Sequence, residues 1–473
     1  METLYMSISS VTESALDTQI DMSAEDLERC PDAPWVLIKA LVNLPEMVRH
    51  QIESYNDFVN VQMPKTISMF VPVKVRSEQD YDPESKKYKL EIEISFSNPL
   101  VYVPQIHENN GAMKIMFPQE ARLRNFTYSA NTVVDLNIKY IVRGGENLES
   151  VQIIHSKLPQ ISIGKIPIML RSSICVLNQY KHVDSAVSGE CKMDPGGYFI
   201  IHGSEKACLA QERAAENQVS VFDVSKGNTK WSWLAEIKSV PDWKCISPKQ
   251  INMTIASKNN GFGFGIYVQI PRVKQPLPLF VLFRAMGVIT DREICERIVL
   301  DIHNSDNDAI LKALEASVVD GSQVMTQQDA IASVTTQVMF TPLNMDKEAG
   351  AKRKREFAED VLENDVFPHC RDKEQKVYFL GYMANKLIRT SLRRRMPDDR
   401  DSYLNKRVDL VGMLLNNLYR NYFNKMVKDM QKQIIREINN GSWRSSEDYR
   451  SIINPTNIYK IVKSATVENG LKR

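Results

Sequence analysis

The chain has 473 residues, of which 43% are hydrophobic and 25% are charged, and its formal net charge is +2. These values are close to the globular average and exclude fibrous and wholly disordered classes. The longest apolar stretch, Pro276 to Phe283, contains two prolines and ends at Arg284, so it is too short to span a membrane. A chain of this length is expected to form roughly two to four domains.

The seven cysteines are scattered along the chain and are never spaced as a CxxC pair. This pattern favours reduced thiols and argues against a disulfide framework or a zinc module. No basic residue precedes Arg29, so the N-terminus lacks the charged head of a secretory signal. We therefore expect an intracellular protein that is not secreted. The cysteines are Cys30, Cys175, Cys191, Cys208, Cys245, Cys295 and Cys370.

The charges are unevenly distributed along the chain. The first 28 residues carry seven acids and no base, whereas Lys386 to Arg436 carries thirteen Lys or Arg residues against five Asp residues. A basic stretch of this kind is typical either of a solvated helix face or of a surface that faces nucleic acid, and the charges alone leave both open.

The N-terminal third predicts a helix followed by a sheet. Residues 1–35 are polar and acidic, and "APWVLIKALVNLPEMVRHQIESYNDFV" then shows helical periodicity. From Thr66 to about Ile168, apolar and polar residues alternate, as in "KYKLEIEISF", which predicts antiparallel strands. The apolar positions of the helix are Val48, Ile52, Tyr55 and Phe58.

The stretch "GECKMDPGGYFIIHGSEKACLAQERAAENQ" combines turn residues with a short apolar run. Tyr198–Ile201 reads as a buried strand entered through the turn Asp194–Gly197, because Pro fixes φ and Gly permits positive φ. His202 and Gly203 predict a second turn. The following "SEKACLAQERAAEN" is expected to be helix-like.

A second β-rich body is predicted after this stretch, from "VSVFDV", "WSWLAEIKSV", "QINMTIAS" and "FGIYVQIP". The glycines of "NNGFGFG" suggest a phosphate loop, but no Lys-Ser/Thr pair follows, so a bulged hairpin is favoured. From Thr290 the period becomes helical, and Thr326 with Asp329 three residues later predicts a helix cap.

The last part of the chain is strongly helical between Gln375 and Ile438. In "VDLVGMLLNNLYRNYFNKMVKDMQKQII" an apolar stripe from Val408 to Ile434 keeps helical spacing and is expected to be core, while four cations lie off it. Upstream, "KRKR" is open to two interpretations, a solvated helix end or a nuclear address. The cations off the stripe are Lys425, Lys428, Lys432 and Arg436.

Four stretches together resemble one family, the second-largest (β-like) subunit of multisubunit DNA-dependent RNA polymerase in its eukaryotic, archaeal and large-DNA-virus form. The central stretch is similar to the family's "GGYFIINGSEK…AQER" signature, with His202 where Asn is usual. The last stretch is similar to its "DDRDH…KR" element, with Ser402 and Tyr403 in an altered middle. The stretches are "FPQEARLRNFTYSA" (Phe117–Ala130), "IGKIPIMLRS" (Ile163–Ser172), the central stretch, and "FLGYMANKLI" (Phe379–Ile388) with "DDRDSYLNKRVDLVG" (Asp398–Gly412).

The resemblance implies an α+β fold, in which a protrusion domain of mixed sheet and helices carries an inserted α+β lobe domain. The implied domains are an acidic arm (1–35), the protrusion (36–205 and 369–434), the lobe (206–368) and an incomplete start of the fork (435–473). Apolar residues of this last segment are then expected to lack cover. These residues are Ile452, Ile453, Ile458 and Ile461.

The implied function is that of the N-terminal part of this subunit, which scaffolds the enzyme and guides nucleic acid during DNA-templated RNA synthesis. The chain is then an enzyme only as part of the complex, with no catalytic residue, metal site or cofactor of its own, since Mg²⁺ is expected on the largest subunit. The alternative is a free-standing module that binds polymerase or DNA without catalysis. An independent hydrolase has little support, because no Ser/His/Asp or Cys/His set is suggestively spaced.

The partners implied are the largest subunit, the remaining part of the second-largest subunit, other polymerase subunits, the DNA template and the RNA product, with no membrane. The expected location is the nucleus for a cellular eukaryotic protein, and the host cytoplasm or the virion for a viral one.

Five cations are candidate contacts to nucleic acid. Lys206 and Arg213 follow a predicted rigid bend, and the competing interpretation is a local ion-pair set with Glu205 and Glu212. In "DDRDSYLNKR" four charges precede a predicted helix, where acids favour the positive end of the helix dipole. These acids are also expected to hold three cations toward phosphates. The three cations are Arg400, Lys406 and Arg407.

Overall fold

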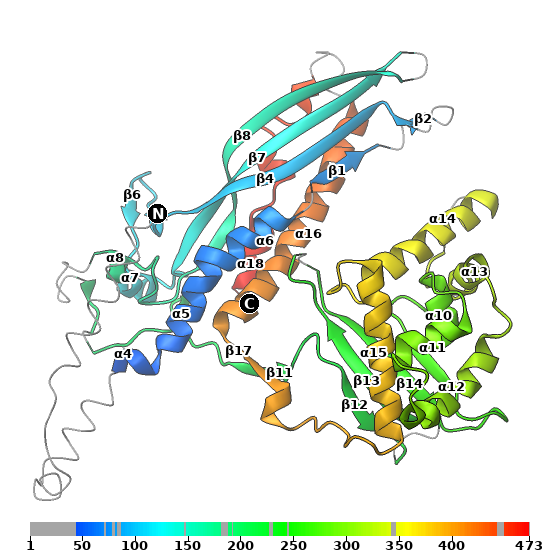
Figure 1. Ribbon diagram of the computed structural model, residues 1–473. Helices are drawn as coiled ribbons and strands as arrows, with labels where there is room; N and C mark the ends of the chain where they lie inside the picture. Colours follow the sequence, from blue (N-terminus) through cyan, green and yellow to red (C-terminus); the bar gives the residue numbers. More distant parts are fainter. Residues whose placement is uncertain are drawn as a thin grey trace, which may run out of the picture.

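The computed structural model describes residues 44–70, 72–77, 81–82, 87–145, 148–180, 188–191, 193–226, 230–243, 246–341, 347–441 and 449–472. It consists of two bodies joined by two chain segments, and each body combines helices with antiparallel sheet (Figure 1). The predicted α+β class is therefore confirmed. The acidic arm, Cys30 and Cys245 lie outside the described residues.

The first body is built on a four-stranded antiparallel sheet with the order β1-β4-β7-β8. Along β7, buried and partly exposed residues alternate as the sequence pattern predicts, because only one face of the sheet meets the core. The sheet begins later than expected, since Thr66 lies in helix α6 and its hydroxyl donates to Asn416. Its strands are β1 (Val73–Arg76), β4 (Leu90–Val101), β7 (Ser129–Gly144) and β8 (Ser150–Pro167).

One long helix, α16 (Val411–Asn440), packs against this sheet and against the N-terminal helices (Figure 1). Of the predicted apolar stripe, Val411, Met426, Met430 and Ile434 are buried in the core, and Leu415, Leu418 and Tyr422 are partly buried against it. Val408 is the exception, because the chain at that position is a strand and the side chain is exposed. The N-terminal helical run is α4 (Leu44–Met47), α5 (Arg49–Asp57), the π-helical turn η1 (Phe58–Gln62) and α6 (Met63–Met69).

The C-terminal segment belongs to the core of the first body. The expectation that its isoleucines lack cover is wrong: they are all buried in the same hydrophobic cluster as the sheet and α16. The reason is that η7 and α17 pack on α16, while the following α18 packs on both α16 and β8. The elements are η7 (Tyr449–Ile452), α17 (Ile458–Ile461) and α18 (Ala465–Leu471).

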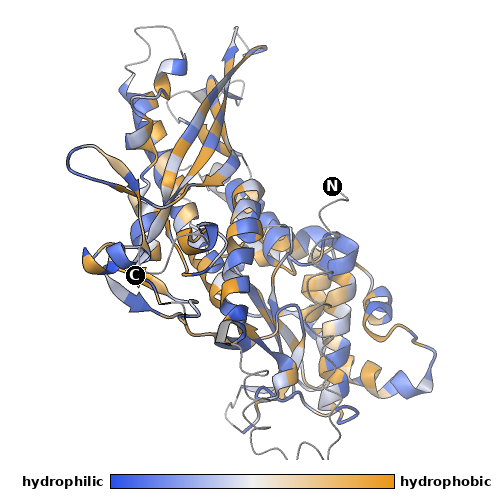
Figure 2. Ribbon diagram, turned by 90° about the vertical axis from the view of Figure 1, so that its left-hand side faces the viewer, coloured by the Kyte–Doolittle hydropathy of each residue, from blue (hydrophilic) through white to orange (hydrophobic). Residues whose placement is uncertain are grey.

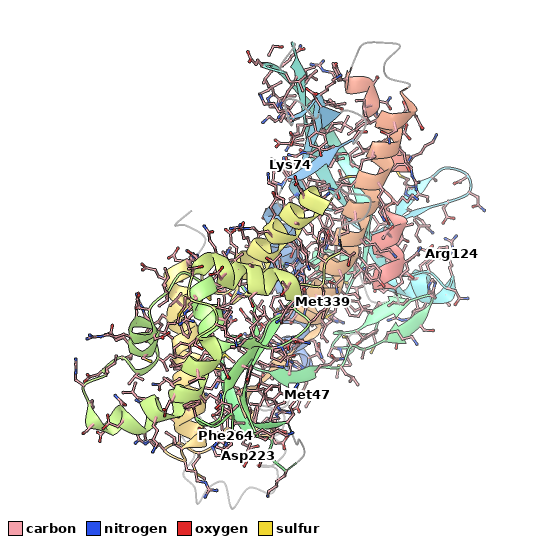
Figure 3. All side chains as sticks on the ribbon, turned by 90° about the vertical axis from the view of Figure 1, so that its right-hand side faces the viewer. Met47, Lys74, Arg124, Asp223, Phe264 and Met339 are labelled. Atoms are coloured by element: carbon pink, nitrogen blue, oxygen red, sulfur yellow. The ribbon has the colours of Figure 1, made fainter. Side chains whose placement is uncertain are left out.

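Smaller elements complete the first body. Arg124, at the end of α7, forms an ion pair of 2.7 Å with Glu108 next to a short hairpin, and Figure 3 shows Arg124 at the edge of this body. The elements are β2 (Tyr81–Asp82), β3 (Lys87–Tyr88), β5 (Gln105–His107), β6 (Met113–Ile115), α7 (Pro118–Leu123), α8 (Val176–Gln179), β9 (Phe199–Ile201) and β10 (Ser204–Lys206).

The second body has a core of its own, formed by a five-stranded antiparallel sheet and a group of helices. The four strands predicted from its sequence are all present. Figure 2 shows apolar residues along the strands and on the inward sides of the helices. The strands are β12 (Ser220–Asp223), β13 (Trp231–Ser239), β14 (Lys249–Ala256), β15 (Ile266–Gln269) and β16 (Leu277–Pro278).

The helices of the second body begin with α10, which contains most of the long apolar stretch and is buried at every position; its one charged residue, Arg284, is held by the Asp291 carboxylate and by the backbone carbonyl of Ile289. The predicted cap is confirmed, since the Thr326 hydroxyl accepts from the Asp329 N–H at 3.2 Å. The glycine-rich "NNGFGFG" forms the loop between β14 and β15. The helices are α10 (Leu279–Ala285), α11 (Asp291–Val299), η3 (Ser305–Asn307), α12 (Asp308–Gly321), α13 (Gln327–Gln337), α14 (Lys347–Asp360), η4 (Val361–Asp365) and α15 (Lys373–Ser391).

Two segments cross between the bodies and pair with each other. On the outgoing segment lies β11 (Gln211–Ala214), and on the returning segment lie η5 (Tyr403–Asn405) and β17 (Lys406–Asp409). The helix-like interpretation of "SEKACLAQERAAEN" is therefore wrong. Its residues form β10 and β11, because each finds a strand partner, in β9 and in β17 respectively.

Candidate nucleic-acid interface

The central sequence stretch forms two turns around a buried strand, as predicted. The Asp194 carboxylate accepts the Gly196 N–H at 2.9 Å, and Gly196 and Gly197 both have positive φ. After β9, His202 and Gly203 have φ values of 51° and 77° and join β9 to β10 as a two-residue hairpin loop. Positive φ at both positions is the pattern of a type I′ loop, which explains why a polar residue followed by Gly stands here.

Arg122 of α7 holds this stretch to the first body. Its guanidinium forms ion pairs with Glu190 at 2.5 Å and Glu205 at 2.7 Å, and donates to the Tyr198 hydroxyl at 2.9 Å. Burial opposes the charge on Arg122, but the hydrogen bonds to Glu190 and Glu205 and the charge of Glu190 together outweigh it, so the pKa of Arg122 is raised. Sequence reasoning missed this network; the signal available was an Arg inside one family motif close to acids of another.

Strands β11 and β17 form a two-stranded antiparallel ribbon between the two bodies. In its register Arg213 lies opposite Arg407, and Glu212 lies opposite Val408. Directly opposed residues share a face, so Arg213 and Arg407 lie on one face and Lys406 on the other. The structure thus brings together three of the five predicted site residues, from two motifs nearly 200 positions apart.

Carboxylates within the ribbon hold two of its cations. Arg213 pairs with Asp409 at 2.7 Å and with Glu216 at 3.2 Å. Lys406 pairs with Glu212 at 2.8 Å, and this hydrogen bond raises the pKa of Lys406. The competing interpretation of a local ion-pair set with Glu205 and Glu212 is wrong in its partners, because Glu205 pairs with Arg122 and Glu212 pairs with Lys406. Arg213 instead pairs across the ribbon with Asp409 and along its own segment with Glu216.

Arg407 and Lys206 have more open surroundings. The Arg407 guanidinium donates to the backbone carbonyls of Leu404 at 3.2 Å and Lys406 at 2.7 Å. Within the described part of the chain, neither Arg407 nor Lys206 forms an ion pair with a carboxylate, and both side chains are exposed. These two cations are therefore available to an external anion.

Arg400 lies apart from the ribbon, against the second body. Its guanidinium is 4.1 Å from the centroid of the Phe222 ring and 3.5 Å from a Glu236 carboxylate oxygen. The expectation that neighbouring aspartates hold Arg400, Lys406 and Arg407 is wrong. The acids that contact Arg400 and Lys406 come from other strands instead.

Asp398 has a structural place in the second body. Its carboxylate accepts the Val221 N–H at 2.9 Å and pairs with the Lys386 ammonium at 3.0 Å. Burial opposes ionisation, but these hydrogen bonds outweigh it, and the pKa of Asp398 is lowered. The prediction that the acids between Asp398 and Asp401 cap a helix is wrong, because η5 and then β17 intervene before α16.

Lys386 is a residue that sequence reasoning did not single out. On α15 it is only 7% exposed, and besides Asp398 its ammonium donates to the Val219 carbonyl.

Exposed apolar side chains were missed as well, because nothing in their local sequence pattern separates them from core residues. Leu209, Tyr403 and Leu404, at or near the ends of the ribbon, are 81%, 82% and 85% exposed.

The exposed cations of this arrangement can bind anions. Among the described residues, no group of three or more His, Cys, Asp or Glu side chains could hold a metal ion. No helix in the described ranges is both long and apolar enough to cross a membrane. The five cysteines within these ranges, Cys175, Cys191, Cys208, Cys295 and Cys370, are free thiols.

Comparison with known proteins gives one consistent family. The family model described as RNA polymerase beta subunit matches residues 46–468. DNA-directed RNA polymerase II subunit 2 of Arabidopsis thaliana is 32% identical over 464 residues, which cover 95% of this chain and 36% of that protein. DNA-directed RNA polymerase II subunit RPB2 of Encephalitozoon cuniculi is 34% identical over 413 residues, which cover 86% of this chain and 34% of that protein.

An archaeal relative is covered more fully. DNA-directed RNA polymerase subunit Rpo2N of Methanococcus vannielii is 31% identical over 409 residues, which cover 85% of this chain and 74% of that protein. The chain thus spans about a third of the length of the polymerase II relatives. It belongs to the RNA polymerase beta subunit family, as the N-terminal part of a second-largest polymerase subunit.

Proposed function

We propose that this chain works within a DNA-directed RNA polymerase, where it scaffolds the assembly and guides nucleic acid in the active-centre cleft. The observation that carries the proposal is the β11–β17 ribbon, which places cations of two family motifs together on an exposed surface. Phosphates bind such cations irrespective of base sequence, as a polymerase that moves along any template requires. Under this proposal the protein works inside the cell.

Within this proposal the first body is the protrusion, the second body is the lobe, and residues 435–473 begin the fork. The two separate hydrophobic clusters support a division into protrusion and lobe, since one combines both ends of the described chain and the other is formed by the segment between them. The bounds differ from the expected ones, because α15 contributes to the core of the second body and the segment after residue 449 contributes to the core of the first. The catalytic step belongs to the assembly, with Mg²⁺ on the largest subunit. We expect the purified chain alone to show no template-dependent nucleotide incorporation.

The contact to nucleic acid is tested by a salt titration of DNA affinity with the purified 473-residue chain. Arg407→Ala should lower the slope of log affinity against log salt by about 0.9, because one phosphate contact is lost. Lys432→Ala is the matched control, an exposed cation on α16 far from the ribbon in sequence, and should leave the slope unchanged. Equal slopes for Arg407→Ala and the unmodified chain would show that the ribbon cations are only structural.

The other partners proposed are the largest subunit, the remaining part of the second-largest subunit and the other polymerase subunits. Tyr403 and Leu404 support a protein contact at one end of the ribbon, since two neighbouring large apolar side chains are exposed there together. Leu404→Asp should weaken co-purification of the chain with the other subunits while leaving its thermal unfolding unchanged. Undiminished co-purification would instead favour a free-standing module.

A further inference from the structure

A cavity of about 450 Å³ lies in the second body and shares no residue with the ribbon. Its walls come from the ends of α10 and α14, the first turns of α13, η4, the start of α15 and the loop after β13. Figure 1 shows α10, α13, α14 and α15 gathered in one group of helices beside the sheet of this body. Cavities of this volume are typical of sites that bind small molecules.

The inner wall of this cavity is largely apolar. Met286 and Cys370 belong to the hydrophobic core of the second body, and Ile331 and Leu362 pack against that core while staying partly exposed. Burial raises the pKa of the Cys370 thiol to about 11, so this side chain stays neutral and acts as one more apolar surface. A wall of this kind gains free energy when hydrocarbon instead of water covers it.

Hydrogen-bond donors converge at the rim of the cavity. The Lys373 ammonium lies 3.4 Å from the point where a Cβ of Gly287 would stand, and the Gln327 amide nitrogen lies 3.7 Å from the same point. Within the described part of the chain, neither Lys373 nor the neighbouring Arg371 forms an ion pair with a carboxylate, and both are exposed. An ammonium and an amide this close together favour an anionic group of a ligand.

The carboxylates of the lining limit the charge of that ligand. Glu359 is already paired with Arg355 on α14 at 3.2 Å, whereas Glu363 forms no ion pair with any described residue. The buried Lys376 adds a third cation, and its ammonium donates to the Glu363 backbone carbonyl. Three cations therefore face two carboxylates in the lining, so one negative charge on a ligand balances the site and a second one does not.

The walls of the cavity are fixed by the surrounding fold. The Cys370 N–H donates to the Phe367 carbonyl at 2.9 Å and closes a tight turn in which Phe367 has a φ of 44°. Such a φ is rare for a bulky residue and persists here because the buried Phe367 ring packs against Phe379 of α15, with 5.0 Å between ring centroids. On another wall the Arg371 guanidinium lies 5.0 Å from the centroid of the Trp243 ring. Because the site is formed before a ligand arrives, the entropy cost of binding is low.

We propose that this cavity binds a small amphipathic monocarboxylate, with its hydrocarbon part against Met286 and Leu362 and its carboxylate beside Lys373. A carboxylate matches the lining better than a phosphate monoester does, because the monoester carries more than one negative charge at neutral pH and Glu363 repels the excess. The proposal goes beyond the function proposed above and does not rest on it, since this ligand is not a nucleic acid and the ribbon takes no part in holding it.

The test is isothermal titration calorimetry of sodium octanoate with the purified 473-residue chain. Octanoate should bind at one site with a negative heat-capacity change, because apolar surface is buried. Hexanoate should bind about ten-fold more weakly, since two fewer methylene groups are covered. Octylammonium has the same hydrocarbon chain and the opposite charge, so it should give no binding heat. Octylammonium or octyl phosphate that binds as tightly as octanoate would overturn the assignment to a monocarboxylate.

Variants locate the binding in this cavity. Lys373→Glu should weaken octanoate binding by at least about five-fold, because an attraction becomes a repulsion. Lys352→Glu on α14 is the matched control and should leave the affinity unchanged, since Lys352 is an exposed lysine outside the lining. Ile331→Trp fills the cavity and should abolish binding, and its thermal unfolding shows whether the fold is kept. Gln327→Trp is a second filling variant, at a lining position outside the core cluster. Octanoate affinity that is unchanged in Lys373→Glu and in a folded filling variant would overturn the proposal.

Discussion

Asp398 and Arg407 come from one short charged stretch, yet the structure gives them opposite surroundings. The Asp398 carboxylate is largely buried and is shared between a strand N–H and the Lys386 ammonium. The Arg407 guanidinium is exposed and bonds only to backbone carbonyls of its own segment. The comparison teaches that one charged sequence motif can combine a structural half and a surface half. The burial of each side chain and its bonding partners distinguish the two halves, whereas its charge does not.

The largest effect on stability is expected at Asp398, the buried half of the charged stretch. Asp398→Asn should lower the free energy of unfolding by roughly 1.5–3 kcal/mol, because Lys386 then remains buried without its carboxylate. Urea denaturation measures the change. Asp401→Asn is the control and should stay within about 0.5 kcal/mol of the unmodified chain, since Asp401 is exposed. Coincident transitions for Asp398→Asn and Asp401→Asn would contradict the structural role.

The same carboxylate predicts a pH dependence. The pKa of Asp398 is lowered by folding, so its contribution to stability is complete above the unfolded pKa of about 3.9 and is lost as pH falls through the folded value. The difference in unfolding free energy between the unmodified chain and Asp398→Asn should therefore shrink below about pH 4. A difference that stays constant across this range would mean that the lowered pKa is not what stabilises the fold.

A smaller effect, on DNA affinity, is expected at Lys406, a cation that the ribbon itself holds in an ion pair. Glu212→Gln removes the carboxylate paired with Lys406 and leaves that ammonium free for phosphate. Exposed ion pairs are weak, so DNA affinity should rise only modestly, by about 1.4- to 5-fold. A DNA-binding titration at fixed salt measures this. Unchanged affinity would place Lys406 outside the contact surface and narrow the interface to Arg407 and Lys206.

The smallest effect is expected on the stability of the exposed half. Arg407→Ala should change the unfolding free energy by less than about 0.5 kcal/mol, because no carboxylate among the described residues depends on Arg407. Thermal unfolding of the variant beside Asp398→Asn provides the measurement. A loss as large as that of Asp398→Asn would erase the distinction between the two halves.

Local pattern was sufficient for the elements that depend on near neighbours. The alternation in β7 predicts a sheet with one buried face, and the spacing from Val411 to Ile434 predicts the buried side of α16. The turn at His202 and Gly203 follows from residue types that accept positive φ. Each of these features is decided within a few residues of chain, which is the range over which periodicity and turn chemistry act.

What could not be predicted depends on partners far away in the sequence. Lys406 meets Glu212 across 194 positions, and Arg213 meets Asp409 across 196. β11 is a strand only because β17 pairs with it, so its local pattern gave the wrong element. Lys386 looks like any helical lysine, and the isoleucines near the C-terminus look unprotected, until β8, β12 and α16 are placed around them.

The order in which the chain leaves the ribosome follows from how the two cores are assembled. The core of the second body is complete once Ile388 has emerged, because all its members lie between Val219 and that residue. The core of the first body combines residues before Ile201 with α16 and the C-terminal helices, so its early strands wait until Leu471 has been made. Synthesis therefore delivers a finished inserted unit while the sheet of the surrounding unit still lacks the helices that cover its apolar face, a stage at which exposed apolar surface is prone to aggregation.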